Sequence, residues 1–104
     1  MNGWVRVCSK SELLPGEFRL AYDGDTAIAV FNIGGELYAI EDICSHDGGE
    51  LAGGPIEGFT IECPRHGAKF DLRTGDALCA PAYLPTAKFP VQVDADGVWT
   101  RDDR

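Results

Sequence analysis

Two short segments of the chain carry residues of the types that bind metals. The first holds Cys44 and His46 with one residue between them, and the second holds Cys63 and His66 with two residues between them. Together they offer two thiolates and two imidazoles, enough to complete a four-ligand site. Each segment supplies one sulfur and one nitrogen, so the ligands come from two separate loops.

Two kinds of metal centre use such a ligand set. A structural zinc site takes two cysteines and two histidines, but zinc fingers usually draw the cysteine pair from one turn and the histidine pair from a helix. Two irons shared between two loops instead require one cysteine and one histidine from each loop. The order in this chain favours the two-iron centre, and a zinc-binding module is the alternative.

The spacing of the four ligands is similar to that of a known family. The C-x-H segment, a long loop and the second segment, Cys63-Pro64-Arg65-His66-Gly67, together resemble the cluster motif of Rieske-type iron–sulfur proteins. In these proteins two histidines replace two cysteines on one iron of a [2Fe–2S] cluster. The resemblance extends from about residue 41 to about residue 70, and more loosely over the whole chain.

The resemblance also implies where each ligand belongs. One [2Fe–2S] cluster per chain would be held by Cys44 and Cys63 on the inner iron and by His46 and His66 on the outer iron, near the protein surface. Two neutral imidazoles in place of two thiolates make the cluster less negative, which lowers the cost of adding an electron.

Residues after the second histidine indicate which kind of Rieske protein this is. Family members of high potential typically have an extra cysteine in each cluster loop and a serine and a tyrosine that donate hydrogen bonds to cluster sulfurs. Here neither loop has the extra cysteine, and Ala68 and Phe70 stand where the two hydroxyls would be. Such hydrogen bonds stabilise the reduced cluster, so we expect a potential at the low end of the Rieske range.

Low-potential domains that stand alone resemble the ferredoxin component of multicomponent ring-hydroxylating dioxygenases. The resemblance implies a soluble one-electron carrier that accepts electrons from a flavoprotein NAD(P)H reductase and passes them to a terminal non-haem iron oxygenase. We expect no catalytic centre in this chain, because an oxygenase iron commonly needs two histidines and a carboxylate. The chain has only two histidines, His46 and His66, and by this resemblance both would be cluster ligands. The alternative is a small Rieske-like subunit of a nitrite reductase, bound permanently to its enzyme.

Length, charge and hydropathy limit the remaining possibilities. With 104 residues, 44% of them hydrophobic, the chain should form a single domain over residues 1–104, with cluster-binding loops at about 41–70. The net charge of −8 argues against nucleic acid as a partner, because nucleic-acid binders present a basic surface. No apolar run is long enough to cross a bilayer. We therefore expect a cytoplasmic protein without a membrane partner, and a monomer if it is a shuttle.

Two further cysteines, Cys8 and Cys79, lie outside the motif. In a reducing cytoplasm a small hydrophobic thiol is the expected role of each, so we predict that they do not form a disulfide.

The hydrophobic pattern predicts an all-β protein, an antiparallel Rieske-like sandwich or barrel with a small cluster-binding subdomain made of the two loops. Apolar residues alternate as in half-buried strands, and glycine-containing turns separate the segments. We expect one helical turn after a capping box at Ser9–Glu12, and an edge or bulge at Pro90, which cannot donate to a ladder. The predicted strands cover residues 4–8, 18–22, 26–33, 37–40, 59–63, 69–72, 89–94 and 98–100.

Overall fold

The computed structural model describes residues 3–44, 49–64, 67–80 and 84–104, which form β-strands, turns and one short 3-10 helix. In chain order the elements are β1 (Val5–Cys8), η1 (Lys10–Glu12), β2 (Phe18–Asp23), β3 (Thr26–Ile33), β4 (Glu36–Glu41), β5 (Ile56–Glu57), β6 (Thr60–Glu62), β7 (Lys69–Asp71), β8 (Ala77–Cys79), β9 (Lys88–Phe89), β10 (Val91–Asp94) and β11 (Gly97–Thr100). All strand pairs are antiparallel. The prediction of an all-β antiparallel fold is confirmed.

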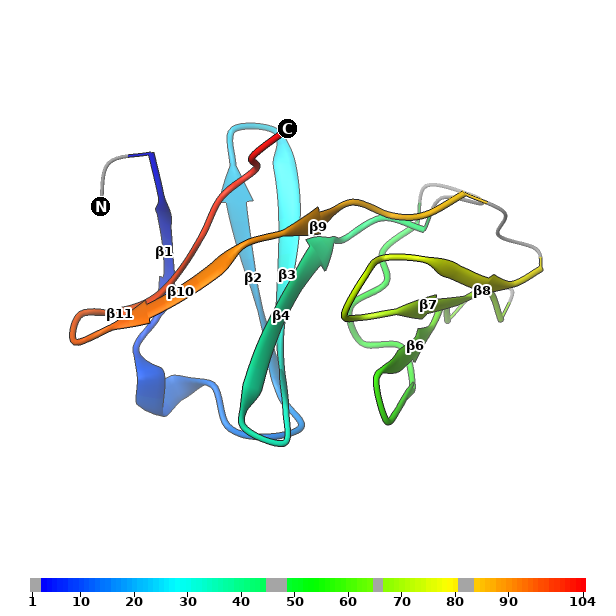
Figure 1. The fold of residues 1–104 in the computed structure, drawn as a ribbon, viewed down its shortest axis with the longest axis horizontal. Coiled ribbons are helices and arrows are strands. Elements are labelled where there is room, and N and C mark those ends of the chain that lie inside the picture. The colour runs from blue at the N-terminus through cyan, green and yellow to red at the C-terminus, as the bar shows by residue number, and fades with distance from the viewer. Residues whose placement is uncertain (1–2, 45–48, 65–66, 81–83) are drawn as a thin grey trace.

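The strands form three sheets. One sheet has the order β1-β11-β10, the second β2-β3-β4-β9, and the third β5-β6-β7-β8. Figure 1 shows the first two sheets together on one side, here called the base, and the third sheet apart from them on the other side. We call the third sheet with its flanking loops, residues 42–85, the small lobe. The chain enters this lobe after β4 and leaves it before β9 (Figure 1).

Strand β3 is the element on which both parts of the molecule pack. Ile28 and Val30 point into the base core, whereas Ala29 and Phe31 point into the core that the small lobe shares with the sheet. All four side chains are fully buried. Both faces of β3 are therefore covered, which explains why its sequence is an almost continuous apolar run instead of an alternating one.

The two cores have separate members. The base core consists of Cys8, Leu13, Ile28, Val30, Ala39, Phe89 and Val98. The lobe core consists of Ala29, Phe31, Ile40, Cys44, Leu51, Ile61, Cys63, Ala68, Phe70 and Leu72. The lobe core thus contains the cysteine of each predicted cluster loop.

Seven of the eight predicted strands agree with the structure to within one residue at each end, but the strand predicted over residues 89–94 is wrong. It is divided at Pro90 into β9, which pairs with β4, and β10, which pairs with β11. The expected edge position is confirmed for β10. The sequence pattern missed β5 and β8, which are only two and three residues long.

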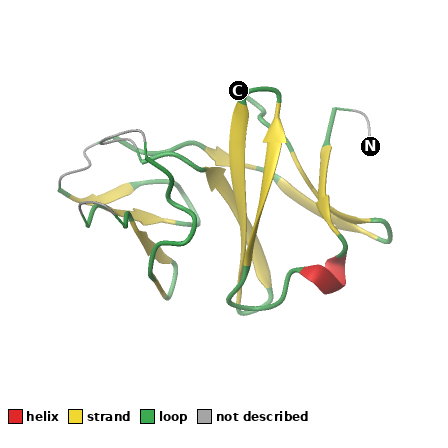
Figure 2. Cartoon of the chain, turned by 180° about the vertical axis from the view of Figure 1, so that it is seen from behind, coloured by secondary structure: helices red, strands yellow, loops and turns green. Residues whose placement is uncertain are grey.

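The helical turn forms where the capping box predicts it. The Ser9 N–H donates to the Glu12 carboxylate at 2.8 Å, and the turn runs from Lys10 to Glu12. Figure 2 shows this turn on the base beside β1, on the side away from the small lobe. Among the described residues, no helix is long and apolar enough to cross a membrane.

An aromatic contact braces the small lobe against the base. Phe59, in the turn between β5 and β6, meets the ring of Tyr38 on β4 edge to face, with centroids 5.8 Å apart. The Arg73 guanidinium lies 4.4 Å from the centroid of the Phe59 ring. The same guanidinium forms an ion pair with Asp71 at 3.0 Å. Such aromatic and cation–π contacts each contribute about 0.5–1.5 kcal/mol.

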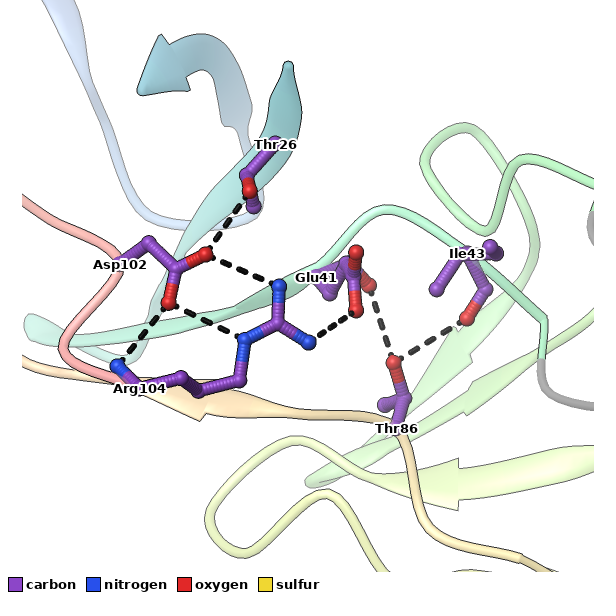
Figure 3. A network of polar contacts seen from close by, with 6 residues as sticks. All are labelled: Thr26, Glu41, Ile43, Thr86, Asp102 and Arg104. Atoms are coloured by element: carbon purple, nitrogen blue, oxygen red, sulfur yellow. Dashed lines mark hydrogen bonds and ion pairs between the residues drawn. The ribbon is translucent and has the colours of Figure 1, made fainter. Parts of the chain in front are cut away.

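Hydrogen bonds fix the two chain segments that join the base to the small lobe. The Glu41 N–H donates to the Ala87 carbonyl at 2.8 Å. The Thr86 hydroxyl can donate to either of two carbonyl oxygens, that of Glu41 at 3.2 Å and that of Ile43 at 3.1 Å (Figure 3). The Thr86 N–H donates to the carbonyl of Gly75 at 2.9 Å. The entering and leaving segments are thereby held side by side.

Asp102 and Arg104 attach the C-terminal residues to the same region (Figure 3). The Asp102 carboxylate accepts hydrogen bonds from the Thr26 hydroxyl at 2.8 Å and from the Arg104 side chain at 2.9 and 3.0 Å. Arg104 also forms an ion pair with Glu41 at 3.2 Å. The segment after β11 is therefore anchored to β3 and to the end of β4.

Asp102 gives the stability of the base a dependence on pH. The hydrogen-bonding Arg104 side chain holds the pKa of this carboxyl well below its ordinary value. A lowered pKa stabilises the folded state above the unfolded-state pKa of about 4, and this contribution is lost as the pH falls toward the folded-state pKa. Asp102→Asn should lower the free energy of unfolding at pH 7, and its difference from wild type should shrink at about pH 3.

Urea unfolding followed by tryptophan fluorescence at the two pH values measures this difference. Asp103→Asn, at the exposed neighbouring position, is the matched control and should change the free energy of unfolding by no more than about 0.5 kcal/mol. An Asp102→Asn difference that stays the same at both pH values would contradict the assignment.

Candidate metal centre

The two cysteines of the motif lie at the start of two loops and are buried together. Cys44 follows β4, and Cys63 directly follows β6. Each is 1% exposed, and both belong to the lobe core. The two predicted thiolate ligands therefore share one apolar interior. His46 and His66 lie outside the described residues.

The two loops are closed by the same kind of backbone hydrogen bond. The Cys44 N–H donates to the carbonyl of Gly49 at 2.7 Å, and the Cys63 N–H donates to the carbonyl of Ala68 at 2.6 Å. In both loops the acceptor is five residues after the cysteine, and in sequence the histidine lies between donor and acceptor. Gly67 closes the second loop with φ +77°, a backbone conformation that favours glycine.

Asp42 holds the first loop at its base, a role that sequence analysis missed. Its carboxylate oxygen Oδ1 accepts hydrogen bonds from the N–H groups of Leu51 at 2.9 Å and Ala52 at 2.7 Å. Its own N–H donates to the Ala27 carbonyl at 2.9 Å. Asp42 is only 8% exposed. It therefore ties both ends of the loop that contains Cys44 to each other and to β3.

A close approach at Gly54 joins the first loop to the strand that leads into the second. A Cβ atom at Gly54 would lie 2.0 Å from the backbone carbonyl oxygen of Glu62, which leaves no room for a side chain. The Glu62 N–H also donates to the Pro55 carbonyl at 2.9 Å. Because Glu62 immediately precedes Cys63, this contact fixes one cysteine relative to the other. In the sequence only the glycine itself signals this contact, because nothing marks Glu62, eight residues later, as its partner.

The second loop buries the two positions that bear on the potential. Ala68 and Phe70 are both fully buried in the lobe core with Cys63. Neither side chain can donate a hydrogen bond. Neither position therefore offers the hydroxyl that a serine or a tyrosine would bring into this core.

None of the four cysteines forms a disulfide, so the expectation for Cys8 and Cys79 is confirmed. Cys8 is buried in the base core, and burial raises the pKa of its thiol, which makes it less reactive. Cys79 is exposed on β8, and its Sγ lies 3.8 Å from the Gly67 carbonyl oxygen, a weak contact.

The donor set fits a [2Fe–2S] cluster with mixed ligands. Cys44 and Cys63 lie at equivalent places in two similarly closed loops, and both belong to one core. One buried sulfur from each loop is what two inner ligands require, and each loop also contains a histidine in sequence.

Comparison with known proteins decides between the cluster and zinc. Residues 3–90 match the Rieske [2Fe–2S] domain family. The chain belongs to this family. The zinc-binding module proposed as an alternative is therefore set aside, and the centre of this Rieske protein is a [2Fe–2S] cluster.

The relatives identify the branch of the Rieske family. The chain is 42% identical over 96 residues to the 3-phenylpropionate/cinnamic acid dioxygenase ferredoxin subunit of Shigella flexneri serotype 5b, covering 91% of this chain and 90% of the relative. The protein of the same name from Escherichia coli K12 matches with the same identity and coverage. This Rieske chain is thus a ferredoxin of the aromatic-ring dioxygenase type, an electron carrier.

Solved structures agree with the fold. The ferredoxin of carbazole 1,9a-dioxygenase from Nocardioides aromaticivorans IC177 superposes with a TM-score of 0.91 at 31% identity, covering 98% of this chain and 100% of that one. A chain in the complex of reduced oxygenase and oxidized ferredoxin in carbazole 1,9a-dioxygenase has a TM-score of 0.89 at 34% identity, with coverages of 97% and 94%. The predicted Rieske-like fold is confirmed.

Placing a hydroxyl in the second loop tests how the buried side chains set the potential. Ala68→Ser should raise the midpoint potential, because a donor to a cluster sulfur stabilises the reduced state. A hydrogen bond to a charged group contributes about 1.5–3 kcal/mol, so the rise should be up to about 65–130 mV for this one-electron couple. Spectroelectrochemical titration measures it, with exposed Ala95→Ser as the control that should not shift. An unchanged potential in a fully loaded Ala68→Ser protein would refute the explanation.

Proposed function

We propose that this Rieske ferredoxin carries single electrons from a flavoprotein NAD(P)H reductase to a terminal non-haem iron oxygenase at low potential. The observation that carries the proposal is the 42% identity, over nearly the whole chain, to dioxygenase ferredoxin subunits. A related solved structure is a complex of oxygenase and ferredoxin, which supports the oxygenase as the electron acceptor. The nitrite reductase subunit considered above has no such support.

We assign four ligands to the cluster: Cys44, His46, Cys63 and His66. The cluster, when bound, supplies a site that accepts one electron and gives it back. Cys44 and Cys63, each 1% exposed, exclude water from the inner side. His46 and His66 would form the outer side, where the path to a partner is shortest.

The surface of the small lobe supports docking of a partner protein. It exposes the apolar side chains of Ile56, Leu78 and Leu84, which are 37%, 49% and 67% accessible. A few apolar contacts favour a small interface, and a net charge of −8 can steer the chain toward basic patches on its partners. Small and electrostatically steered interfaces suit a carrier that must dissociate after each electron.

We also infer that the chain works as a monomer in the cytoplasm, as a single domain over residues 1–104 with cluster-binding loops at about 41–70. A nucleic-acid partner is disfavoured by the net negative charge.

Electron transfer kinetics test the shuttle. Stopped-flow mixing of the reduced chain with a purified dioxygenase oxygenase component should show a second-order rate that falls roughly tenfold or more between about 0.1 M and about 1 M salt. Glu57→Gln, at an exposed position, and Glu62→Gln, at a half-buried one, both in the sheet of the small lobe, should slow the reaction at low salt and not at high salt. Asp25→Asn, in the turn between β2 and β3, is the control. A complex that survives size exclusion at high salt would indicate a fixed subunit instead.

A further inference from the structure

The carboxylate of Asp42 is a buried charge in the part of the small lobe that holds the cysteines. Its Oδ1 atom accepts two backbone N–H groups, those of Leu51 and Ala52. Among the described residues, no ion pair involves Asp42. The two N–H groups are neutral dipoles, so they stabilise the charge without cancelling it.

The charge lies close to the centre. Asp42 precedes Cys44 by two residues, and two residues span at most about 7 Å between Cα atoms. Leu51, which donates to the carboxylate, belongs to the lobe core together with Cys44 and Cys63. Asp42 itself is only 8% exposed, and salt and water screen a buried charge less than an exposed one.

A carboxylate closes the loop through charge-assisted hydrogen bonds, and it also brings a negative charge into the lobe. An asparagine amide oxygen could accept the same two N–H groups, and would avoid the cost of burying a net charge. What the carboxylate adds is its negative charge.

We propose that the buried negative charge of Asp42 lowers the reduction potential of the centre. One-electron reduction, with the electron supplied by the flavoprotein reductase, adds one negative charge to the cluster. A fixed negative charge nearby destabilises the reduced state more than the oxidised state. This inference rests on the proposed function, and it adds a second cause of low potential to the missing hydroxyls at positions 68 and 70.

The test compares the loss of one charge at three positions. Asp42→Asn removes the buried charge and keeps an acceptor oxygen. Glu50→Gln removes an exposed charge from the same loop, and Asp96→Asn removes an exposed charge from the turn between β10 and β11. The midpoint potential of each loaded protein is measured at low and high salt, and the electron paramagnetic resonance spectrum of the reduced form reports whether the ligand shell is intact.

Asp42→Asn should raise the potential at least twice as far as either control, with an unchanged resonance spectrum. The rise should persist at high salt, because ions do not reach a buried charge, whereas any shift from Glu50→Gln should decrease. A rise no larger than that of the controls would overturn the proposal. A wild-type protein without a cluster spectrum would instead overturn the proposed function.

Asp42→Ser and Asp42→Glu keep the test decisive if Asp42→Asn fails to hold a cluster. The neutral serine variant should have a raised potential, and the charged glutamate variant should keep a potential close to that of wild type. If both neutral variants lose the cluster and only Asp42→Glu retains it, the residue is needed to build the shell and the proposal is overturned.

Discussion

The structure depends on holding two loops so that one cysteine from each faces the same interior. Hydrogen bonds to Asp42 close the first loop, and the close approach of Gly54 to Glu62 joins it to the strand before Cys63. The core in which both sulfurs lie is completed by side chains of β3. A shift in any of these contacts would move one sulfur relative to the other, and we propose that both sulfurs bind one cluster.

The base serves this arrangement by giving β3 and β4 a second packed face. Ile28 and Val30 are buried against one sheet while Ala29 and Phe31 are buried against the small lobe. The lobe, whose own strands are two or three residues long, could not form a stable core alone.

The sequence predicted those features of the structure that are determined by residues close together in the chain. The C-x-H and C-x-x-H spacing predicted a [2Fe–2S] cluster, which the family match confirms. Alternating residues and one apolar run located the longer strands to within a residue. Contacts between distant residues were not predictable. Pro90 was expected to mark an edge, yet it separates two strands of different sheets. Asp42 read as one of many acidic residues, because only the fold brings Leu51 and Ala52 to it.

The central claim is that one cluster is held by two sulfurs and two nitrogens from these loops. Pulsed electron paramagnetic resonance of the reduced protein, with and without isotopically labelled histidine, tests it most directly. We predict hyperfine couplings from two histidine nitrogens that change with the label. A reduced spectrum without any histidine nitrogen coupling, or a fully metallated protein that is colourless and has no such spectrum, would contradict the claim.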